Sequence, residues 1–315
     1  MSDFLWKVKW GLKAITPPII VLGAKTLLIK LGLRQPDATP VTEPLPEPEV
    51  APEWEYVPEG WARAESDPSV KGWDVEAVAA AYKEKWPAFV RAIEAPKPLG
   101  VYHEIGAGEA ITGEDAAAHN LLLTFAYVAA LAAHGKDRLT FLDWGGGIGH
   151  YGELARAVLP VEVDYHCREV PATVAVAREL GIEGRFVSDH SWSDRSYDLV
   201  LASGSLQYAE DWRAQLGELA AVTNGFLFVT RLPSARSSGS FHILQRAYRY
   251  GYETEYVGWV VGRPELLEAA AGLGLTLERE FVLDAWLSAP GAPEDPIGHR
   301  GFLFSVGDGR AATSA

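Results

Sequence analysis

The sequence has one cysteine, Cys167, among 315 residues. A single thiol excludes an intramolecular disulfide, and no cluster of Cys and His residues has the spacing of a zinc site. We therefore expect a protein of a reducing compartment, by default the cytoplasm, with no bound metal. Cys167 lies in an apolar stretch and is expected to be a buried strand residue.

Long hydrophobic runs are also missing from the N-terminal part of the chain. The longest uncharged run there, residues 14–24, has 11 residues and contains Pro17 and Pro18. A helix needs about 20 apolar residues to cross a bilayer, so this run is too short. It is not closed by a small-residue cleavage site, which argues against a secretory signal.

Positive charge is scarce. The chain has 28 Lys and Arg against 42 Asp and Glu, a formal net charge of −14. Nonspecific binding to nucleic acid requires a basic face for the phosphates, so nucleic acid is excluded as a partner. The 48% hydrophobic content is sufficient for a sizeable core. We expect one main domain with appendages.

Charge is unevenly distributed, and basic residues outnumber acidic ones in the N-terminal segment. Residues 1–34 contain one acid, Asp3, and six basic residues among apolar ones: Lys7, Lys9, Lys13, Lys25, Lys30 and Arg34. A basic amphipathic segment is typical of a helix that lies on anionic lipid. It is equally typical of a helix docked on its own domain or on a partner, and both interpretations stay open.

The next segments differ in composition. Residues 35–60 alternate proline with glutamate, which predicts an extended linker. Residues 61–136 predict a helical cap region, with helices over Val75–Ile93 and Glu114–Ala133. Residues 137–308 form the main domain, and residues 309–315 are a tail.

The most specific pattern opens the main domain. The apolar stretch that starts at Leu139 ends in Asp143, and Gly145, Gly147 and Gly149 follow before a helical pattern begins. Glycine lets the backbone turn sharply and approach a ligand closely. The helix that follows presents unpaired N–H groups at its start. This order predicts a nucleotide-cofactor loop.

The glycines fit a dinucleotide site in one register. Gly147-x-Gly149-x-x-Gly152 is the dinucleotide fingerprint, and Glu169, 17 residues after Gly152, lies near the expected place of the ribose-binding acid. In such folds the glycines usually begin where the strand ends. Here several residues, from Asp143 on, would intervene before Gly147, which disfavours this register.

The other register, Asp143-x-Gly145-x-Gly147-x-Gly149, closely resembles class I S-adenosylmethionine-dependent methyltransferases. The resemblance implies S-adenosylmethionine as the cofactor. Glu169 follows a predicted strand and suits the two ribose hydroxyls, and Asp189 suits the adenine amino group. The full set of expected cofactor-binding residues is Asp143, Gly145, Gly147, Gly149, Glu169, Asp189, Ser203 and Gly204.

Strand and helix patterns alternate after the loop. Strands are expected over Val161–Cys167, Gly184–Val187 and Tyr197–Ala202, with a helix over Ala172–Leu180. This predicts an α/β fold, a doubly wound Rossmann-like sheet. The resemblance implies seven strands with an antiparallel final strand, and it assigns Leu275–Leu287 and Arg300–Val306 to the final pair.

The fourth predicted strand strengthens the resemblance. Tyr197-Asp-Leu-Val continues into Ser203-Gly-Ser-Leu-Gln-Tyr208, and in this superfamily the loop after that strand borders the reacting methyl group. More narrowly, Glu169-Val-Pro171, Thr230-Arg-Leu-Pro233 and Gln245 resemble a group of methyltransferases associated with bacterial polysaccharide and surface-glycan genes.

Methyl transfer to a hydroxyl requires that its proton be removed. His242 is the first candidate for the base and His150 the second, because histidine titrates near neutral pH. Gln207 and Tyr208 are expected to position the acceptor. Residues 234–262 form a lid insertion rich in aromatic side chains with hydrogen-bonding tips, suited to sugars or flat acceptors.

The sequence thus predicts a methyltransferase that acts on a glycan or a small hydroxylated acceptor. Two alternatives remain open. One is an NAD(P)-dependent oxidoreductase, which would use Glu169 for ribose preference. The other is a non-catalytic scaffold that binds the cofactor and is recruited through its basic N-terminus. The sequence does not indicate an oligomeric state.

Overall fold

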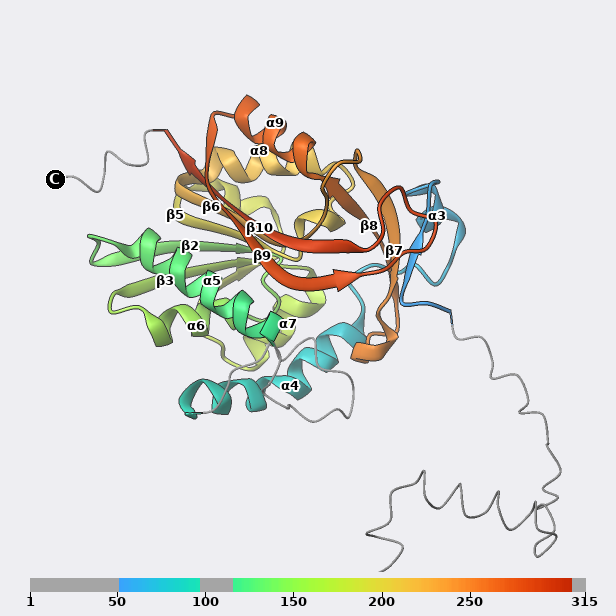
Figure 1. Ribbon diagram of the computed structural model, residues 1–315. Helices are drawn as coiled ribbons and strands as arrows, with labels where there is room; N and C mark the ends of the chain where they lie inside the picture. Colours follow the sequence, from blue (N-terminus) through green and yellow to red (C-terminus); the bar gives the residue numbers. More distant parts are fainter. Residues whose placement is uncertain (1–50, 97–115, 308–315) are drawn as a thin grey trace, which may run out of the picture. The chain divides into compact units, whose positions relative to one another are not determined.

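A computed structural model describes residues 51–96 and 116–307 of the protein. The elements below belong to the unit that begins at Pro52 (Figure 1). The helices are α3 (Ala62–Ser66), α4 (Glu76–Glu94), α5 (Ala116–Ala133), α6 (His150–Val158), α7 (Pro171–Glu179), α8 (Trp212–Val222) and α9 (Arg263–Gly272). Three short 3-10 helices are η2 (His190–Asp194), η3 (Leu206–Tyr208) and η4 (Ala247–Tyr250).

The strands form one sheet. They are β1 (Trp54–Tyr56), β2 (Arg138–Trp144), β3 (Glu162–Arg168), β4 (Arg185–Val187), β5 (Tyr197–Ser203), β6 (Thr223–Ala235), β7 (Phe241–Arg246), β8 (Glu255–Gly262), β9 (Leu275–Leu287) and β10 (Ile297–Val306). The core order is β4-β3-β2-β5-β6, all parallel, and β10 then pairs antiparallel with both β6 and β9.

This seven-stranded core confirms the predicted Rossmann-like sheet with its antiparallel final pair. The chain runs outward from β2 to β4 and then returns to β5 on the other side of β2. Ligands of doubly wound sheets bind at such a switch point, outside the carboxyl ends of the strands. The arrangement therefore places the candidate site where β2, β3 and β5 end.

Helices cover both faces of the sheet (Figure 1). On one face α5 packs against β2, β5, β6 and β9, α6 packs against β3, and α4 packs against α6 and α7. On the other face α8 lies against β5 and β6 and contacts α9. Two large apolar clusters fill these interfaces.

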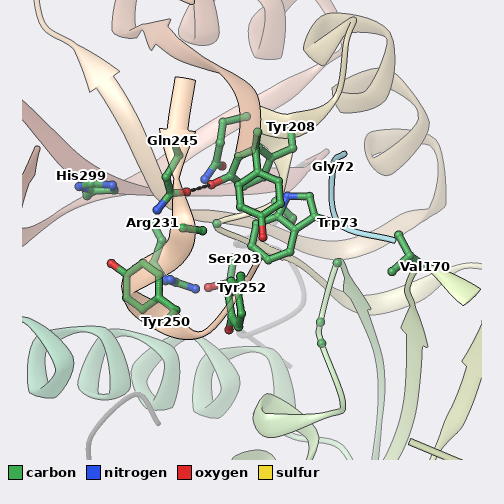
Figure 2. A pocket seen from close by; sticks show the side chains of 18 of the residues that line it. Gly72, Trp73, Val170, Ser203, Tyr208, Arg231, Gln245, Tyr250, Tyr252 and His299 are labelled. Atoms are coloured by element: carbon green, nitrogen blue, oxygen red, sulfur yellow. Dashed lines mark hydrogen bonds between the residues drawn. The ribbon is translucent and has the colours of Figure 1, made fainter. Parts of the chain in front are cut away.

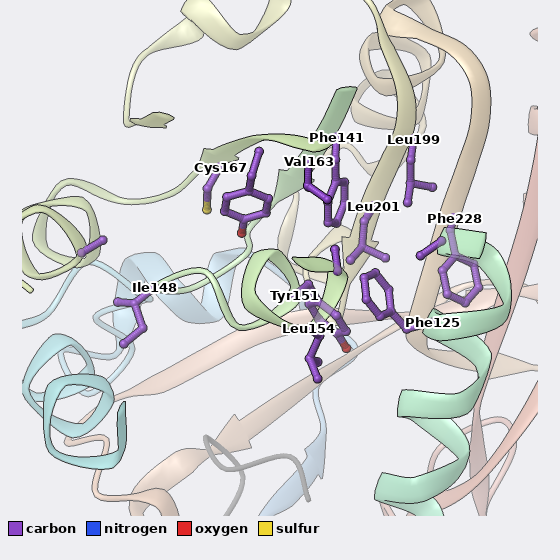
Figure 3. Close-up of a cluster of buried hydrophobic side chains, with 14 of the residues drawn as sticks. Phe125, Phe141, Ile148, Tyr151, Leu154, Val163, Cys167, Leu199, Leu201 and Phe228 are labelled. Atoms are coloured by element: carbon purple, nitrogen blue, oxygen red, sulfur yellow. The ribbon is translucent and has the colours of Figure 1, made fainter. Parts of the chain in front are cut away.

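Strand β2 shows how the sequence fills both clusters. Successive side chains of a strand point to opposite faces: Leu139 and Phe141 join the cluster beneath α5, and Leu142 and Trp144 join the one beneath α8. Figure 3 shows Phe141 near Phe125 of α5 and Leu201 of β5. Each fully buried phenylalanine contributes about 2–3 kcal/mol of transfer free energy. This continuous apolar pattern fixes the strand that carries the glycine loop.

Helix α5 is long and apolar enough, by length and composition alone, to cross a membrane. Its buried residues, including Phe125 and Val128, pack into the cluster on the sheet. This packing accounts for the apolar composition of α5, as in the core helix of an α/β protein. The helix was expected over Glu114–Ala133, and the described part agrees.

Two domain boundaries need correction. The predicted linker, residues 35–60, includes β1, which pairs antiparallel with β7 through Trp54↔Gln245 and Tyr56↔Ile243. The predicted lid, residues 234–262, contains β7 and β8, an antiparallel pair that joins the end of β6. These three strands extend the sheet to ten. The proline content concealed β1, whose partner β7 is far away in the chain. The aromatic content of residues 234–262 indicated a lid rather than the β7–β8 pair.

Other boundaries fall outside the described residues. These are the basic segment 1–34, most of the linker, residues 97–115 of the predicted cap region and the tail 309–315.

Candidate functional site

A cavity of about 740 Å³ opens at the carboxyl ends of β2, β3, β5 and β6. Its volume lies within the range of roughly 300–1,000 Å³ that is usual for small-molecule sites. One side is formed by the glycine loop and Glu169. The other is lined by aromatic side chains from the segment before α4 and from η3, η4 and β8 (Figure 2). We call these the cofactor half and the acceptor half.

The glycine loop begins directly after β2. Gly145 and Gly147 have φ values of 71° and 61°, in the left-handed region that favours glycine. A Cβ on Gly145 would lie 2.5 Å from the Cβ of Ser205, and one on Gly146 would lie 2.3 Å from Cγ of Asp143. The loop thus packs closely against a buried acid and against the loop after β5.

Gly149 and Gly152 have a different role. Gly149 has a φ of 101° and is the N-cap of α6, and it does not line the cavity. A Cβ on Gly152 would lie 2.9 Å from the ring of Tyr165 in β3. Gly152 therefore permits close helix–strand packing. The third glycine of the dinucleotide fingerprint has the same packing role, so Gly152 does not distinguish the two registers.

Asp143 lies beneath the loop rather than in the cavity. Its side chain is fully buried and accepts a hydrogen bond of 2.8 Å from the hydroxyl of Tyr165. Burial raises the pKa of Asp143 to about 7. The expectation of direct cofactor contact is corrected: Asp143 supports Gly146 from below, and the cavity is lined by the glycines above it.

Glu169 lines the cavity just past the end of β3. One carboxylate oxygen accepts the N–H of Gly147 at 3.1 Å, and the other accepts the N–H of Val170 at 2.6 Å. Burial raises the pKa of this carboxyl to about 7, against the opposing effect of the two backbone donors. An ionised carboxylate has about four acceptor positions, so two remain for a ligand.

Ser203 and Gly204 also line the cavity, as expected. The Oγ of Ser203 lies 2.8 Å from the hydroxyl of Tyr151. Ser205 donates to the carbonyl of Trp144 at 2.7 Å, which ties the β5 loop to the glycine loop. Because η3 follows directly, Gln207 and Tyr208 are held beside the cofactor half.

Asp189 is not brought into this group. Its exposed carboxylate accepts the N–H of Ser191 at 3.1 Å and caps η2, and it does not line the cavity. The adenine contact remains a prediction that this geometry does not support.

The two candidate histidines are poorly placed for base catalysis. His242 lies under Gly60 and against Trp259, with ring centroids 3.7 Å apart, outside the cavity lining. His150 does line the cavity, but its ring packs against Trp86 and Phe89, and burial lowers its pKa to about 3. A neutral imidazole with so low a pKa is a weak base, so neither assignment is supported.

Arg231 enters the cavity through a β-bulge that was not predicted. Thr230 and Arg231 of β6 face the single residue Gly301 of β10, and Arg231 has a φ of 52°. A left-handed non-glycine residue costs about 1–2 kcal/mol, and bulges redirect side chains near active sites. Figure 2 shows Arg231 near Tyr250 and Tyr252. Burial lowers the pKa of the guanidinium.

The acceptor half contains further residues that the pattern did not single out. Trp73 stacks on Tyr256 with ring centroids 4.2 Å apart. Glu53, from the expected linker, accepts from Tyr250 at 3.0 Å. A signal existed for Arg231, because it is the one charged residue in the strand β6. The pattern holds no such signal for Glu53, whose place depends on pairing with β7.

No cluster of three or more His, Cys, Asp or Glu side chains able to hold a metal is found within residues 51–96 and 116–307.

Comparisons with known proteins find similarity among solved structures only. No family model and no curated protein matches the chain. Magnesium protoporphyrin IX methyltransferase from Synechocystis PCC 6803, with bound S-adenosylmethionine, is 16% identical, with a TM-score of 0.42 over 73% of this chain and 95% of that one. The N-terminal domain of EvdMO1, with bound S-adenosylhomocysteine, is 15% identical, with a TM-score of 0.45 over 70% and 97%.

A third similar structure is the [4+2]-cyclase SpnF, 16% identical, with a TM-score of 0.43 over 74% of this chain and 96% of that one. Similarity at this level does not transfer the chemistry of these proteins, and one fold can host several reactions. The activity of this chain has to be argued from its own cavity.

Proposed function

We propose that the protein is a class I S-adenosylmethionine-dependent methyltransferase. The observation that carries the proposal is the contact between Glu169 and the N–H of Gly147 at the rim of the cavity. Glu169 follows β3 and Gly147 follows the neighbouring strand β2. The contact therefore joins the two loops at the switch point of the sheet. A nucleoside ribose binds at such a junction in doubly wound folds.

The residues present fit this cofactor. A Cβ on Gly147 would enter the space beside Tyr82, 3.6 Å from its ring, so glycine leaves that space to a ligand. The two remaining acceptor positions of Glu169 match two ribose hydroxyls. The register also agrees, since β2 ends at Trp144 and the turn begins at Gly145, without the intervening residues that a dinucleotide register would require.

The bound cofactor would supply an activated methyl group on its sulfonium. The protein then has to hold an acceptor in line and to exclude water, which supplies much of the catalysis in such displacements. The acceptor half provides an aromatic wall against which an acceptor can pack. Its hydroxyl and amide groups orient the acceptor. We infer O-methylation of a glycan or small hydroxylated acceptor, and the narrower resemblance to methyltransferases of surface-glycan genes points the same way.

Calorimetric titration tests the cofactor. We expect S-adenosylhomocysteine to bind and NAD and NADP not to bind. Glu169→Gln should weaken binding about tenfold or more, because hydrogen bonds to a charged group contribute about 1.5–3 kcal/mol. The matched control is Glu162→Gln, at the opposite end of β3, whose side chain is 67% exposed.

The alternatives give other results. Binding of NAD or NADP without S-adenosylhomocysteine would replace the methyltransferase with an oxidoreductase. Cofactor binding without transfer of labelled methyl to any acceptor in a sugar and phenol panel would favour the scaffold.

We further propose that the protein is cytoplasmic and contacts the membrane surface through residues 1–34. The support is the excess of six basic residues over one acid in that segment of an otherwise acidic chain. Full-length protein should sediment with vesicles containing phosphatidylserine and not with neutral vesicles. Replacing Lys7, Lys9 and Lys13 by Gln should reduce the bound fraction. Equal binding to both vesicle types would contradict the proposal.

A further inference from the structure

The segment before β1 forms part of the cavity wall. Backbone pairing continues past β1, because the N–H of Arg246 donates to the carbonyl of Glu53 at 2.8 Å. Arg246 also forms an ion pair with Glu55 and donates to the carbonyl of Pro52 at 3.0 Å. These contacts fix Glu53 beside Gln245 of β7, and both side chains line the cavity.

A chain of hydrogen bonds starts at Glu53. One carboxylate oxygen accepts from the hydroxyl of Tyr250 at 3.0 Å and from Nε2 of Gln245 at 3.4 Å. Oε1 of Gln245 accepts from the hydroxyl of Tyr208 at 2.8 Å, the bond drawn in Figure 2. The chain of hydrogen bonds therefore links η4, the segment before β1, β7 and η3 around one wall of the acceptor half.

The carboxylate sets the direction of this chain. An ionised carboxylate only accepts, so the amide of Gln245 turns its NH₂ toward Glu53 and its oxygen toward Tyr208. The hydroxyl hydrogen of Tyr208 is thereby committed to Gln245. The side chain of Gln207 also donates to this hydroxyl oxygen, so one lone pair of Tyr208 remains as an acceptor for another donor.

Further polar atoms of this wall lack a protein partner among the described residues. They include the donor Nε1 of Trp73, the acceptor Oε1 of Gln207 and the hydroxyl of Tyr256. Gln207 and Tyr256 are only 6% and 2% exposed. A buried polar atom that makes no hydrogen bond costs about 1–3 kcal/mol. Both residues line the cavity, and the indole of Trp73 covers the ring of Tyr256. The wall thus has apolar faces, and its polar tips include an unpaired acceptor at Gln207 and an unpaired hydroxyl at Tyr256.

We propose that this wall is the acceptor subsite and that it binds a neutral sugar ring through its hydroxyl groups. Hydroxyls donate to the oxygens of Tyr208 and Gln207, and the ring packs against the aromatic wall. A polyol supplies several hydroxyl donors to such acceptors. Glu53 is a positioning residue: it acts through Gln245 and sets the hydrogen-bond direction of Tyr208. The proposal deepens the proposed function and rests on it.

The test uses full-length protein saturated with S-adenosylhomocysteine. Saturation-transfer NMR is recorded with the methyl α-glycosides of D-glucose, D-mannose, D-galactose and L-rhamnose, and with catechol as a flat phenol. We expect at least one glycoside to bind and catechol not to bind. Glu53→Gln should weaken the bound glycoside about fivefold, because its amide no longer fixes Gln245, while affinity for S-adenosylhomocysteine stays unchanged.

The matched control is Glu59→Gln, whose side chain is 43% exposed in the same segment and outside the cavity lining. In the double variant Glu53→Gln with Gln245→Glu, the carboxylate at position 245 accepts from the hydroxyl of Tyr208, and the amide at position 53 donates to that carboxylate. This variant should restore glycoside binding. A merely structural role for Glu53 would predict no such rescue.

Several results would overturn the inference. They are binding of catechol alone, no binding of any probe, unchanged glycoside binding in Glu53→Gln, or no rescue in the double variant. In each case normal binding of S-adenosylhomocysteine leaves the proposed function standing. Failure of the unmodified protein to bind S-adenosylhomocysteine would overturn both.

Discussion

The two halves of the cavity differ in how far apart in the chain their parts lie. In the cofactor half, Gly147 and its partner Glu169 are 22 residues apart, on one strand–helix–strand unit. In the acceptor half, Glu53 and its partner Gln245 are 192 residues apart and meet only because β1 pairs with β7. One half is encoded locally and the other by tertiary pairing.

The halves also differ in chemistry. Backbone N–H groups and carboxylates dominate the cofactor half, where glycine leaves the main chain accessible. Tyrosine and tryptophan side chains dominate the acceptor half, and they come from the segment before α4, from η3 and η4 and from the added strand β8. Substitutions in one half should therefore leave the other nearly unchanged, and this separation can be tested.

The largest expected effect is at Gly146. In Gly146→Ala the new Cβ would lie 2.3 Å from Cγ of the buried Asp143, so the loop has to move. We expect affinity for S-adenosylhomocysteine to fall about a hundredfold, equivalent to roughly 2.7 kcal/mol, in calorimetric titration. Gly217→Ala is the control, because its Cβ has room in α8, with the nearest atom 3.7 Å away.

The control has its own expected result. Alanine is favoured over glycine inside a helix by about 0.5–1 kcal/mol, so Gly217→Ala should raise the midpoint of thermal unfolding and leave cofactor affinity unchanged. Equal affinity for S-adenosylhomocysteine in Gly146→Ala and the parent chain would show that the loop does not carry the cofactor.

The second effect is a pH dependence confined to the cofactor half. Burial raises the pKa of Glu169 to about 7, and only the ionised carboxylate accepts from both ribose hydroxyls. Affinity for S-adenosylhomocysteine should therefore fall about tenfold from pH 8 to pH 6, the ratio of ionised fractions at those values. Calorimetry across this range should show a flat profile for Glu169→Gln. A flat profile in the parent chain would contradict ribose binding by Glu169.

The same shifts affect stability. In the folded chain without cofactor, Asp143 and Glu169 keep protons that the unfolded chain releases at lower pH. The free energy of unfolding should therefore decrease as pH rises from about 4 to about 7. Asp143→Asn should reduce this slope in chemical denaturation, whereas Glu162→Gln should not.

Local encoding explains what the sequence predicted. The strands β2 to β5 lie close to the bounds that their own apolar and turn residues predict, and the pair β9 and β10 lies close to the bounds that the family resemblance implies. The glycine loop was also placed by its own local pattern. Asp143 was assigned to the wrong side of that loop, since a pattern of residues does not tell whether an acid faces a ligand or the core.

Tertiary pairing explains what the sequence missed. The prolines before Trp54 indicate a linker, and only the partner strand β7 turns that segment into β1. His242 was favoured for its chemistry alone, and its strand turns it toward Gly60 and Trp259. The bulge that aims Arg231 depends on β10, about 70 residues away along the chain.

The third effect is confined to the acceptor half. Gly258 of β8 lets η3 approach, and a Cβ there would lie 3.3 Å from the ring of Tyr208 and 3.4 Å from the carbonyl of Gln207. Gly258→Ala should displace η3 and weaken glycoside binding about fivefold, close to 1 kcal/mol, at the low end of overpacking costs. Affinity for S-adenosylhomocysteine should stay within about twofold, because the loop after β5 is held separately by Ser205 and Trp144. Equal loss of both ligands would show that the halves are one unit.

The smallest expected effect is at Asp189, the one predicted cofactor residue left exposed on the surface near the site. Its carboxylate caps η2 through the N–H of Ser191, and Asp189→Asn keeps an oxygen that can accept this bond. Affinity for S-adenosylhomocysteine should therefore change less than about twofold, within the usual range for a surface substitution. A loss of about tenfold, with a parallel loss for adenosine in the same titration, would mean that Asp189 turns to the adenine when the cofactor binds. The cofactor half would then also include the loop after β4. If the affinity is unchanged, the cofactor half consists of the glycine loop, Glu169 and the turn after β5. The adenine is then held by residues that no local sequence pattern indicates.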